Sequence, residues 1–349
     1  METTHWIVDK QGITHEHYPQ IEEAARLIRK GEVIAFPTET VYGLGGQVQM
    51  DKAVQKIFTA KGRPSDNPLI VHIADRKDVD HLAQSVPNYA EALMDSFWPG
   101  PLTIIVPKQE GVLSELVTAG LHTVAIRMPD HPVALALIKE AGVPVAAPSA
   151  NRSGKPSPTT AAHVLDDLSG RIAGVLDGGD TGVGLESTVV DCTGPHPIIL
   201  RPGGITQTDM EAVVGKVKIG GALQNEKDVP KSPGMKYTHY APEAPLYLIE
   251  GTHSFIQEQI DELRAEGKKV GVMATEESEH FYVADRIISC GRRHDIESVA
   301  KHLYGALRSF NVSSLDVILA ETFPSEGVGV AIMNRLEKAA GHRWIKEVD

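Results

Sequence analysis

The sequence predicts an α/β protein in two parts. The larger N-terminal part has a mixed, twisted sheet with helices, and the smaller C-terminal part has an open parallel sheet flanked by helices. Two observations support this prediction. Short β-branched runs alternate with amphipathic helical stretches along most of the chain, whose 349 residues suffice for about two separate cores. The alternation weakens from Gln207 and resumes near Leu246, which separates the two parts.

The N-terminal part shows strand and helix signals in turn. Its predicted strands are Val33–Phe36, Leu69–Ile73, Thr103–Val106, Thr123–Met128, Val143–Ala147, Gly174–Leu176, Ser187–Asp191 and Ile198–Leu200. Its predicted helices are Ile21–Lys30, Asp51–Ala60, Asn88–Phe97, Pro132–Ala141 and Thr159–Leu168, the last with Ser157 as N-cap and Pro158 in the first turn. Strands near residues 170–200 follow one another without helices, which predicts a mixed sheet.

The C-terminal part alternates more regularly. Its predicted strands are Leu246–Glu250, Lys269–Ala274, Arg286–Ser289 and Asp316–Ala320, and its predicted helices are Phe255–Glu266, Ile296–Phe310 and Val328–Ala339. Such an order favours a parallel sheet with right-handed crossovers. Lys216–Val229 is predicted to be a loop.

Composition excludes several classes of protein. The formal net charge is −12, which argues against binding to a nucleic-acid backbone as the main activity, although a small basic pocket stays compatible with it. Two cysteines, Cys192 and Cys290, cannot build a disulfide framework or a cysteine-rich zinc site, so we expect a reducing compartment. No signal peptide and no membrane-spanning run is visible, and we expect a cytoplasmic protein.

Common catalytic signatures are absent from the sequence. It contains no phosphate loop of the G-x-x-x-x-G-K-[ST] type, no G-x-G-x-x-G fingerprint, no G-x-S-x-G nucleophile elbow and no H-E-x-x-H helix. His15 and His17 lie in a polar stretch, where a solvated surface is the commoner state. Cys192 follows a predicted strand, where a buried thiol is commoner than a nucleophile. No metal site in the protein is predicted.

Four polar clusters follow predicted strands and are the candidate site. The first, residues 36–45 (FPTETVYGLG), places hydroxyls beside glycines that allow close approach of a ligand, and a tight turn with an N-cap explains it equally well. The second, residues 61–73 (KGRPSDNPLIVHI), holds Lys61 and Arg63, which suit phosphate oxygens but also a helix C-terminus. His72 lies in an apolar strand, where a satisfied core histidine is commoner than a ligand.

The other two clusters carry donors at strand ends. The third, residues 148–158 (PSANRSGKPSP), offers donors where an anion can bind, with a plain Ser/Pro loop as the alternative. The fourth joins Glu186–Asp191 to Arg201-Pro202-Gly203. Arg201 is a phosphate candidate there, and a surface ion pair is its alternative. Arg127 interrupts the apolar run Val124–Met128 and needs a carboxylate, either from a ligand or from an internal Asp or Glu.

These motifs together resemble the Sua5/YrdC family. The matching residues are PTETVYGL at 37–44, KGR at 61–63, SAN at 149–151, STVVD at 187–191, RPG at 201–203, SPGM at 232–235 and HYAP at 239–242. The resemblance covers nearly the whole chain. It implies a YrdC-like catalytic domain over 14–210, a linker that acts as an active-site lid over 211–244, and a Rossmann-like, three-layer Sua5 C-terminal domain over 245–349.

The resemblance implies an L-threonylcarbamoyladenylate synthase, a nucleotidyltransferase. Such an enzyme joins L-threonine, bicarbonate or CO2 and ATP and releases pyrophosphate, in the first step toward N6-threonylcarbamoyladenosine at position 37 of tRNA. It implies Mg²⁺ carried by ATP, and transfer of the product to a tRNA threonylcarbamoyl-transfer complex. Stable direct binding of tRNA is not expected, and no membrane is involved.

The resemblance also implies roles for individual residues. Lys61 and Arg63 would be catalytic. Those that would bind ATP or the adenylate are Lys61, Arg63, Asn67, Thr123, Ser149, Asn151, Ser157, Arg201 and Tyr240. Those that would form the threonine pocket are Thr40, His72, Arg127, Ala147 and Ser187.

Two other functions compete with this one. An RNA-binding module is disfavoured by the acidic charge and by the lack of aromatic residues interleaved with basic ones. A carbamoyl-transfer maturation enzyme of the HypF type would need cysteine-pair zinc motifs, which two cysteines cannot supply. The segment Lys231–Pro242 is itself predicted to dock as a lid over bound ATP, because aromatic side chains such as Tyr237 and Tyr240 are costly to leave in water.

Overall fold

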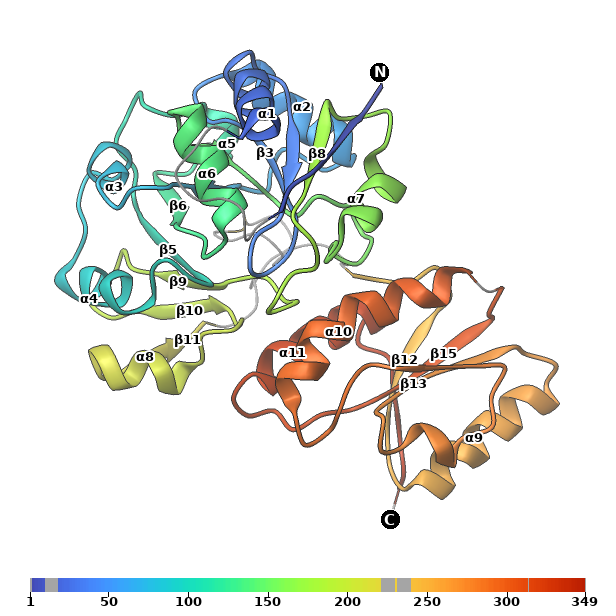
Figure 1. Ribbon diagram of the computed structural model, residues 1–349. Coiled ribbons are helices and arrows are strands. Elements are labelled where there is room, and N and C mark those ends of the chain that lie inside the picture. Colours follow the sequence, from blue (N-terminus) through green and yellow to red (C-terminus); the bar gives the residue numbers. More distant parts are fainter. Residues whose placement is uncertain (1, 10–17, 221–229, 231–239, 313, 349) are drawn as a thin grey trace. The chain divides into compact units, whose positions relative to one another are not determined.

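The computed structural model describes residues 2–9, 18–220, 230, 240–312 and 314–348 (Figure 1). The chain forms two compact units. The first comprises Met1–Ser153, Pro158–Gly182 and Glu186–Lys236, and the second comprises Gly154–Ser157, Val183–Leu185 and Tyr237–Asp349. The domain boundaries implied by the resemblance remain predictions, and most of the predicted lid lies outside the described residues. In the described part of the chain, no helix is both long and apolar enough to cross a membrane.

The first unit is built on one mixed sheet of 11 strands, in the order β1-β8-β2-β3-β7-β4-β6-β5-β9-β10-β11. The strands are β1 (Thr4–Ile7), β2 (Ile34–Phe36), β3 (Gly43–Gln47), β4 (Ile70–His72), β5 (Leu102–Pro107), β6 (Thr123–Arg127), β7 (Val145–Ala146), β8 (Gly174–Asp177), β9 (Thr188–Asp191), β10 (Ile198–Arg201) and β11 (Lys218–Ile219). Parallel pairs such as β4 with β6 lie beside antiparallel pairs such as β5 with β6, so the prediction of a mixed sheet is confirmed.

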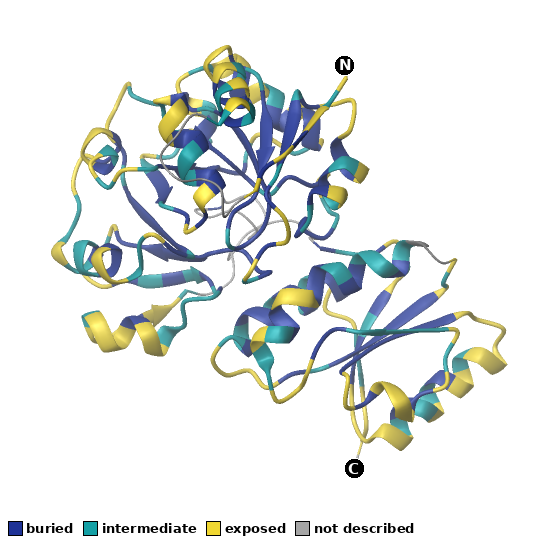
Figure 2. Cartoon of the chain, in the orientation of Figure 1, coloured by how far each residue is buried: buried dark blue, intermediate teal, exposed yellow. Residues whose placement is uncertain are grey.

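Helices cover both faces of this sheet. They are α1 (Pro19–Arg29), α2 (Asp51–Lys61), α3 (Asp78–Leu82), α4 (Asn88–Phe97), α5 (Glu115–Thr118), α6 (Pro132–Ala141), α7 (Ala161–Leu168) and α8 (Gln207–Val214). Alternate residues of a strand point to opposite faces. In β2, Ile34 and Phe36 therefore pack against α1 and α6, whereas Ala35 belongs to the core on the side of α2, α4 and α7. Figure 2 shows the inner strands of the sheet buried between these layers, whereas the edge strands β1 and β11 have exposed residues.

The second unit is a five-stranded, fully parallel sheet in the order β14-β13-β15-β12-β16. Its strands are β12 (Leu246–Glu250), β13 (Val270–Ala274), β14 (Arg286–Ser289), β15 (Val317–Glu321) and β16 (Trp344–Lys346), and its helices are α9 (His253–Ala265), α10 (Ile296–Ser309) and α11 (Gly329–Ala340), with short 3-10 turns η1 (Glu279–Phe281) and η2 (Phe310–Val312). Helix α9 covers one face of the sheet, and α10 and α11 cover the other (Figure 1). The predicted open parallel sheet is confirmed.

Some elements differ from the sequence prediction. Strand β3 was not predicted, because its residues Gly43, Gly45 and Gly46 have low strand propensity and only tertiary pairing with β2 and β7 holds them extended. Helix α7 begins at Ala161 with Thr160 as its N-cap, so the predicted cap at Ser157 is wrong. Six further elements were not predicted, because each is too short or too polar to show a periodic pattern. They are β1, β11, β16, α3, α5 and α8.

Strand β1 lies before residue 14, the predicted start of the first domain. It pairs in parallel with β8, and its Trp6 is buried in the core beside α1. The Trp6 indole also donates a hydrogen bond to Glu23 of α1 at 3.0 Å. The fold of the first unit therefore extends to the described N-terminal residues.

Candidate active site

The segment from residue 37 to residue 42 links β2 to β3 and is a hydrogen-bonded turn. The Thr38 hydroxyl accepts from the backbone N–H groups of Thr40 and Val41, at 3.2 and 3.3 Å. Tyr42 fixes the end of the turn, because its buried phenol donates to the carbonyl of Gly179 at 2.8 Å. The predicted tight turn is therefore confirmed, but it caps no helix, because strand β3 follows it. It leaves the side chains of Glu39 and Thr40 in contact with Arg127 of β6.

The first and third motifs lie side by side. Backbone hydrogen bonds run from Leu44 to the carbonyl of Pro148 at 2.7 Å and from Ala150 to the carbonyl of Tyr42 at 2.8 Å. A β-bridge also joins Gly43 to Ser149. The loop after β7 is thus held along the start of β3, which brings two motifs more than 100 residues apart into contact.

Lys61 joins the second motif to the third. It is the last residue of α2, and its side chain is almost fully buried. Its ammonium donates to the carbonyls of Ser149 and Asn151, the latter at 2.7 Å, and lies 3.3 Å from Asn151 Oδ1. Since these acceptors belong to the SAN motif, Lys61 holds that loop in place. The helix-terminus position that the sequence offered for Lys61 is confirmed, since Lys61 is in the last turn of α2, and the structure adds that its ammonium connects two motifs.

Arg63 and Asn67 lie in the loop that follows. Gly62 ends α2 in the left-handed conformation (φ 64°), which turns the chain and lets Arg63 donate to the carbonyl of Pro68 at 3.2 Å. Asn67 is buried, and neither its amide nitrogen nor its amide oxygen has a hydrogen-bond partner among the described residues. Buried amides are rarely left unsatisfied, so Asn67 is well suited to a bound ligand.

Arg127 connects the first motif to β6. It is buried at the carboxyl end of that strand, where its Nε donates to the carbonyl of Gly100 at 3.3 Å and its guanidinium donates to the Thr40 hydroxyl at 3.0 Å. Its Nη2 lies 2.6 Å from Glu39 Oε1. The sequence left open whether an internal carboxylate accompanies Arg127, and the structure identifies Glu39 as that partner.

His72 lies beside Arg127, because β4 pairs with β6 in a register that places the two residues opposite each other. Its Nδ1 is 3.2 Å from the carbonyl of Ile70, and its ring meets Phe36 edge-on. Burial, and then the charge of Arg127, lower the pKa of His72 to about 3. The imidazole is therefore neutral near neutral pH. Because the Ile70 carbonyl can only accept, Nδ1 carries the proton and donates it, and Nε2 is left as a hydrogen-bond acceptor.

This depressed pKa predicts an acid-sensitive fold. The unfolded chain binds a proton at His72 near its usual pKa of about 6.5, whereas the native protein binds it only near 3. The contribution of His72 to stability is thus complete above about pH 6.5 and is lost as the pH falls toward 3, by up to about 1.4 kcal/mol per pH unit. Denaturant unfolding from pH 7 to 5 measures this slope. It is expected to be shallower in His72→Gln, and an unchanged slope would contradict the prediction.

The fourth motif is assembled around Ser187. This buried serine precedes β9, and its hydroxyl lies 2.7 Å from that of Thr103 on β5. Arg201, at the end of β10, donates to the Ser187 carbonyl at 2.9 Å and to its hydroxyl at 3.1 Å. A side chain at Gly203 would approach the backbone nitrogen of Thr188 to 2.4 Å, so only glycine permits this turn. Arg201 is buried, and its alternative as a surface ion pair is therefore wrong.

The other residues predicted to form the site lie in several separate elements. Ala147 is buried, and its N–H donates to the carbonyl of Ile70 beside His72. Thr123 begins β6 whereas Arg127 ends it, so the two lie about 13 Å apart along the strand. Ser157 is fully buried. Tyr240 has φ 68° and stacks on Tyr304 within the second unit, at a centroid distance of 5.2 Å. The residues implied for the lid from Lys231 to His239 lie outside the described residues.

Sequence reasoning missed two residues of this assembly. Glu39 was quoted only as a letter of the first motif, and Thr103 only as the start of a strand. The need of Arg127 for a carboxylate was the one signal that pointed toward Glu39, and the sequence could not say which acid would supply it. No comparable signal marked Thr103.

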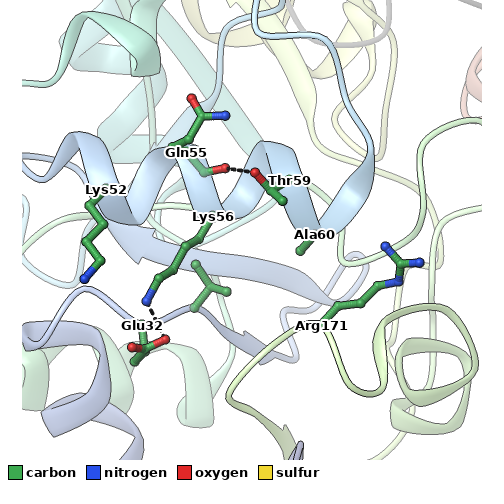
Figure 3. Close-up of a pocket in the computed structure, with 8 residues that line it drawn as sticks. Glu32, Lys52, Gln55, Lys56, Thr59, Ala60 and Arg171 are labelled. Atoms are coloured by element: carbon green, nitrogen blue, oxygen red, sulfur yellow. Dashed lines mark hydrogen bonds and ion pairs between the residues drawn. The ribbon is translucent and has the colours of Figure 1, made fainter. Parts of the chain in front are cut away.

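A separate pocket lies on the surface of α2 (Figure 3). It has a volume of about 480 Å³ and is lined by Glu32, Val33, Lys52, Gln55, Lys56, Thr59, Ala60 and Arg171. Lys56 and Glu32 form an ion pair at 2.6 Å there. None of the predicted site residues lines this pocket, so it is distinct from the site assembled by the four motifs.

The two cysteines do not contribute to the site. Cys192 and Cys290 are both unpaired thiols and both buried. Burial raises the pKa of each thiol well above its usual value, so neither is present as the reactive thiolate near neutral pH. The expectation that Cys192 is a buried, unreactive thiol is confirmed.

Comparison with protein families decides the identity of this assembly. Residues 26–203 match the family model of Sua5, YciO and YrdC, which is described as "Telomere recombination", and residues 205–341 match the "Threonylcarbamoyl-AMP synthase, C-terminal domain". The chain belongs to the Sua5/YrdC family. It has the two-domain Sua5 architecture, and it is an enzyme that forms threonylcarbamoyl-AMP.

Relatives match this Sua5-type chain over nearly all of its length. The threonylcarbamoyl-AMP synthase of Bacillus subtilis is 57% identical over 346 residues, which cover 99% of this chain and 100% of that protein. The enzyme of the same name from Pyrococcus abyssi is 48% identical and covers 94% of this chain and 96% of its own. The crystal structure of P. abyssi Sua5 in complex with L-threonine superposes with a TM-score of 0.92 at 45% identity, over 99% of this chain and 100% of that one.

Proposed function

We propose that the four motifs form one site that binds ATP and L-threonine side by side and joins them, with bicarbonate or CO2, into L-threonylcarbamoyladenylate. One observation carries this proposal. Direct hydrogen bonds and strand pairing unite the first three motifs around two buried cations, Lys61 and Arg127. The fourth motif joins them through the sheet, because its strand β9 pairs with β5 and β5 pairs with β6, the strand of Arg127. The threonine complex of the P. abyssi relative supports the amino-acid half of the site.

The reaction needs positioning more than covalent catalysis. The amine of threonine adds to CO2 and becomes a carbamate, whose oxygen attacks the α-phosphorus of ATP and expels pyrophosphate. Starting from bicarbonate, one water is released as well. No covalent enzyme intermediate is required. The protein holds the reactants close together and neutralises the charge that develops on the phosphates.

The phosphate half of the site would be formed by the second, third and fourth motifs. Arg63 and Arg201 supply guanidinium donors, and the Asn67 amide supplies unsatisfied polar atoms in a buried position. Ser149 and Asn151 lie in the loop that Lys61 holds. We assign these residues to ATP, together with Thr123, Ser157 and Tyr240.

The threonine half would be formed by the turn after β2 and by the ends of β4 and β6. Arg127 offers a counter-charge for the carboxylate of threonine. Thr40, the neutral imidazole of His72 and the Ser187 hydroxyl offer the small polar contacts that a hydroxy amino acid needs. Ala147, buried beside His72, would shape the wall of this pocket.

Magnesium would enter with the nucleotide. Among the described residues, no three His, Cys, Asp or Glu side chains are grouped as a metal site. The side chains assigned to ATP are cationic or neutral and suit phosphates rather than a bare cation. We therefore propose MgATP as the substrate, with the ion coordinated by phosphates and water.

We further propose that the protein works in the cytoplasm and passes its labile product to a tRNA threonylcarbamoyl-transfer complex. The net charge of −12 supports transfer through a protein partner over stable binding of tRNA by this chain.

The experiment that tests the function is direct. Pure protein is incubated with MgATP, labelled L-threonine and bicarbonate, and the products are separated by chromatography. A threonine-containing adenylate that forms together with pyrophosphate is the expected result. ATP consumption without a labelled adenylate would contradict the proposal.

The phosphate assignment predicts that Arg63→Ala and Arg201→Ala each lower adenylate formation by more than tenfold. A charge-assisted contact contributes about 1.5–3 kcal/mol, and about 1.4 kcal/mol corresponds to one decade in rate. Turnover is measured beside thermal unfolding, because Arg201 also holds Ser187. Arg76→Ala, which breaks an ion pair with Glu91 outside the four motifs, is the matched control. Normal turnover in both variants would place the phosphates elsewhere.

A further inference from the structure

The carboxylate of Glu39 has no function in the assignments above. We propose that Glu39 binds the α-ammonium group of L-threonine and thereby makes the site selective for an amino acid over other hydroxy acids. This inference rests on the proposed function, because it concerns the same threonine pocket.

The first observation is that the Glu39 carboxylate is buried but not satisfied. Its side chain is 12% exposed, and neither oxygen accepts a hydrogen bond from any described residue. The contact with Arg127 is short, at 2.6 Å, but it is a charge contact without the alignment of a hydrogen bond. A buried carboxylate usually accepts two or more hydrogen bonds, so Glu39 has free acceptor capacity where the substrate would lie.

The second observation is the charge balance of the pocket. Arg127 and Glu39 carry opposite charges, and His72 is neutral because burial and Arg127 lower its pKa to about 3. Thr40, whose hydroxyl accepts a hydrogen bond from Arg127 at 3.0 Å, is neutral as well. A pocket with one positive and one negative group matches a zwitterion, whose carboxylate and ammonium are separated by a single carbon atom.

The position of Glu39 beside Arg127 affects which carboxylates can bind to Arg127. An incoming carboxylate without an ammonium group would lie beside Glu39, and two like charges at this distance in a buried site repel each other. An ammonium group on the adjacent carbon removes this repulsion, because it can lie between the two carboxylates and donate to Glu39. The same carboxylate that favours threonine therefore disfavours acids that lack the amine.

The test compares two ligands in the wild type and in two variants. Binding of L-threonine and of (R)-3-hydroxybutanoate, which keeps the carboxylate and the hydroxyl but lacks the amine, is measured by calorimetry with the wild type and with Glu39→Gln. Glu32→Gln is the matched control, because it removes the charge of another glutamate that pairs with a cation, in the separate pocket of Figure 3.

We expect Glu39→Gln to weaken threonine binding at least tenfold and to leave 3-hydroxybutanoate binding unchanged or tighter, while Glu32→Gln binds both as the wild type does. Equal weakening for both ligands would assign Glu39 a purely structural role. Tighter threonine binding would make Glu39 a competitor for Arg127, and either result overturns the proposal. A wild type that binds no threonine at all would instead refute the proposed function.

A second measurement does not depend on the variant being stable. A crystal structure of the wild type with L-threonine is expected to place the substrate nitrogen within about 3.2 Å of a Glu39 oxygen, the range of a charge-assisted hydrogen bond. A nitrogen that lies beyond hydrogen-bond distance of both oxygens would overturn the proposal.

Discussion

Lys61→Met is expected to lower the rate of threonylcarbamoyl-AMP formation by about 100-fold or more. The buried ammonium holds the carbonyls of Ser149 and Asn151, and methionine fills a similar volume without a donor. Two charge-assisted hydrogen bonds of about 1.5–3 kcal/mol each are lost, and about 1.4 kcal/mol corresponds to one decade in rate. The loop that is assigned to ATP then loses its fixed position.

The measurement for Lys61→Met is kcat/KM for ATP, with thermal unfolding recorded in parallel. Lys56→Met is the matched control, since it lies on the same helix and removes an ammonium that pairs with Glu32 in the separate pocket. The control is expected to keep nearly full activity. Wild-type kinetics in Lys61→Met would show that the connection to residues 149–151 is dispensable.

Arg127→Leu is expected to raise the KM for threonine by about two decades while the KM for ATP changes little, because only the amino acid loses its counter-charge. The structure adds a second effect. Leucine leaves the Glu39 carboxylate buried without a cation, and breaking a buried pair costs about 3–5 kcal/mol of stability.

A double variant separates the two effects of Arg127→Leu. Arg127→Leu combined with Glu39→Gln no longer buries an unpaired charge, so most of the lost unfolding free energy is expected to return in denaturant titrations. Threonine use is not expected to return, because neither charge is present. Recovery of threonine use in the double variant would contradict the assignment of Arg127 to the carboxylate.

Much of the fold follows from local patterns. The strands around Val71 and Ile126 are short apolar runs buried on both faces, and the helices around Ile57 and Leu137 each bury an apolar face. The parallel C-terminal sheet was predictable because strand and helix signals alternate regularly in that part of the chain.

Elements held by tertiary contacts were not predictable. Strand β3 is rich in glycine and exists because β2 and β7 pair with it, and β1 is a short edge strand anchored by Trp6. Within the site, a motif identified Lys61, and a charged residue within an apolar run identified Arg127. Only the folded structure shows that their partners are the loop of Ser149 and Glu39. Pairings between residues this far apart in sequence leave no periodic signal.

The two buried thiols have a practical consequence for spectroscopy. Cys192 and Cys290 are shielded from solvent, and their raised pKa values suppress the thiolate that maleimide reagents attack. A single cysteine introduced at an exposed position, such as Ile219 or Val283, would therefore react far faster than either native thiol. The wild-type background thus accepts one fluorophore or spin label at a chosen position without prior removal of its own cysteines.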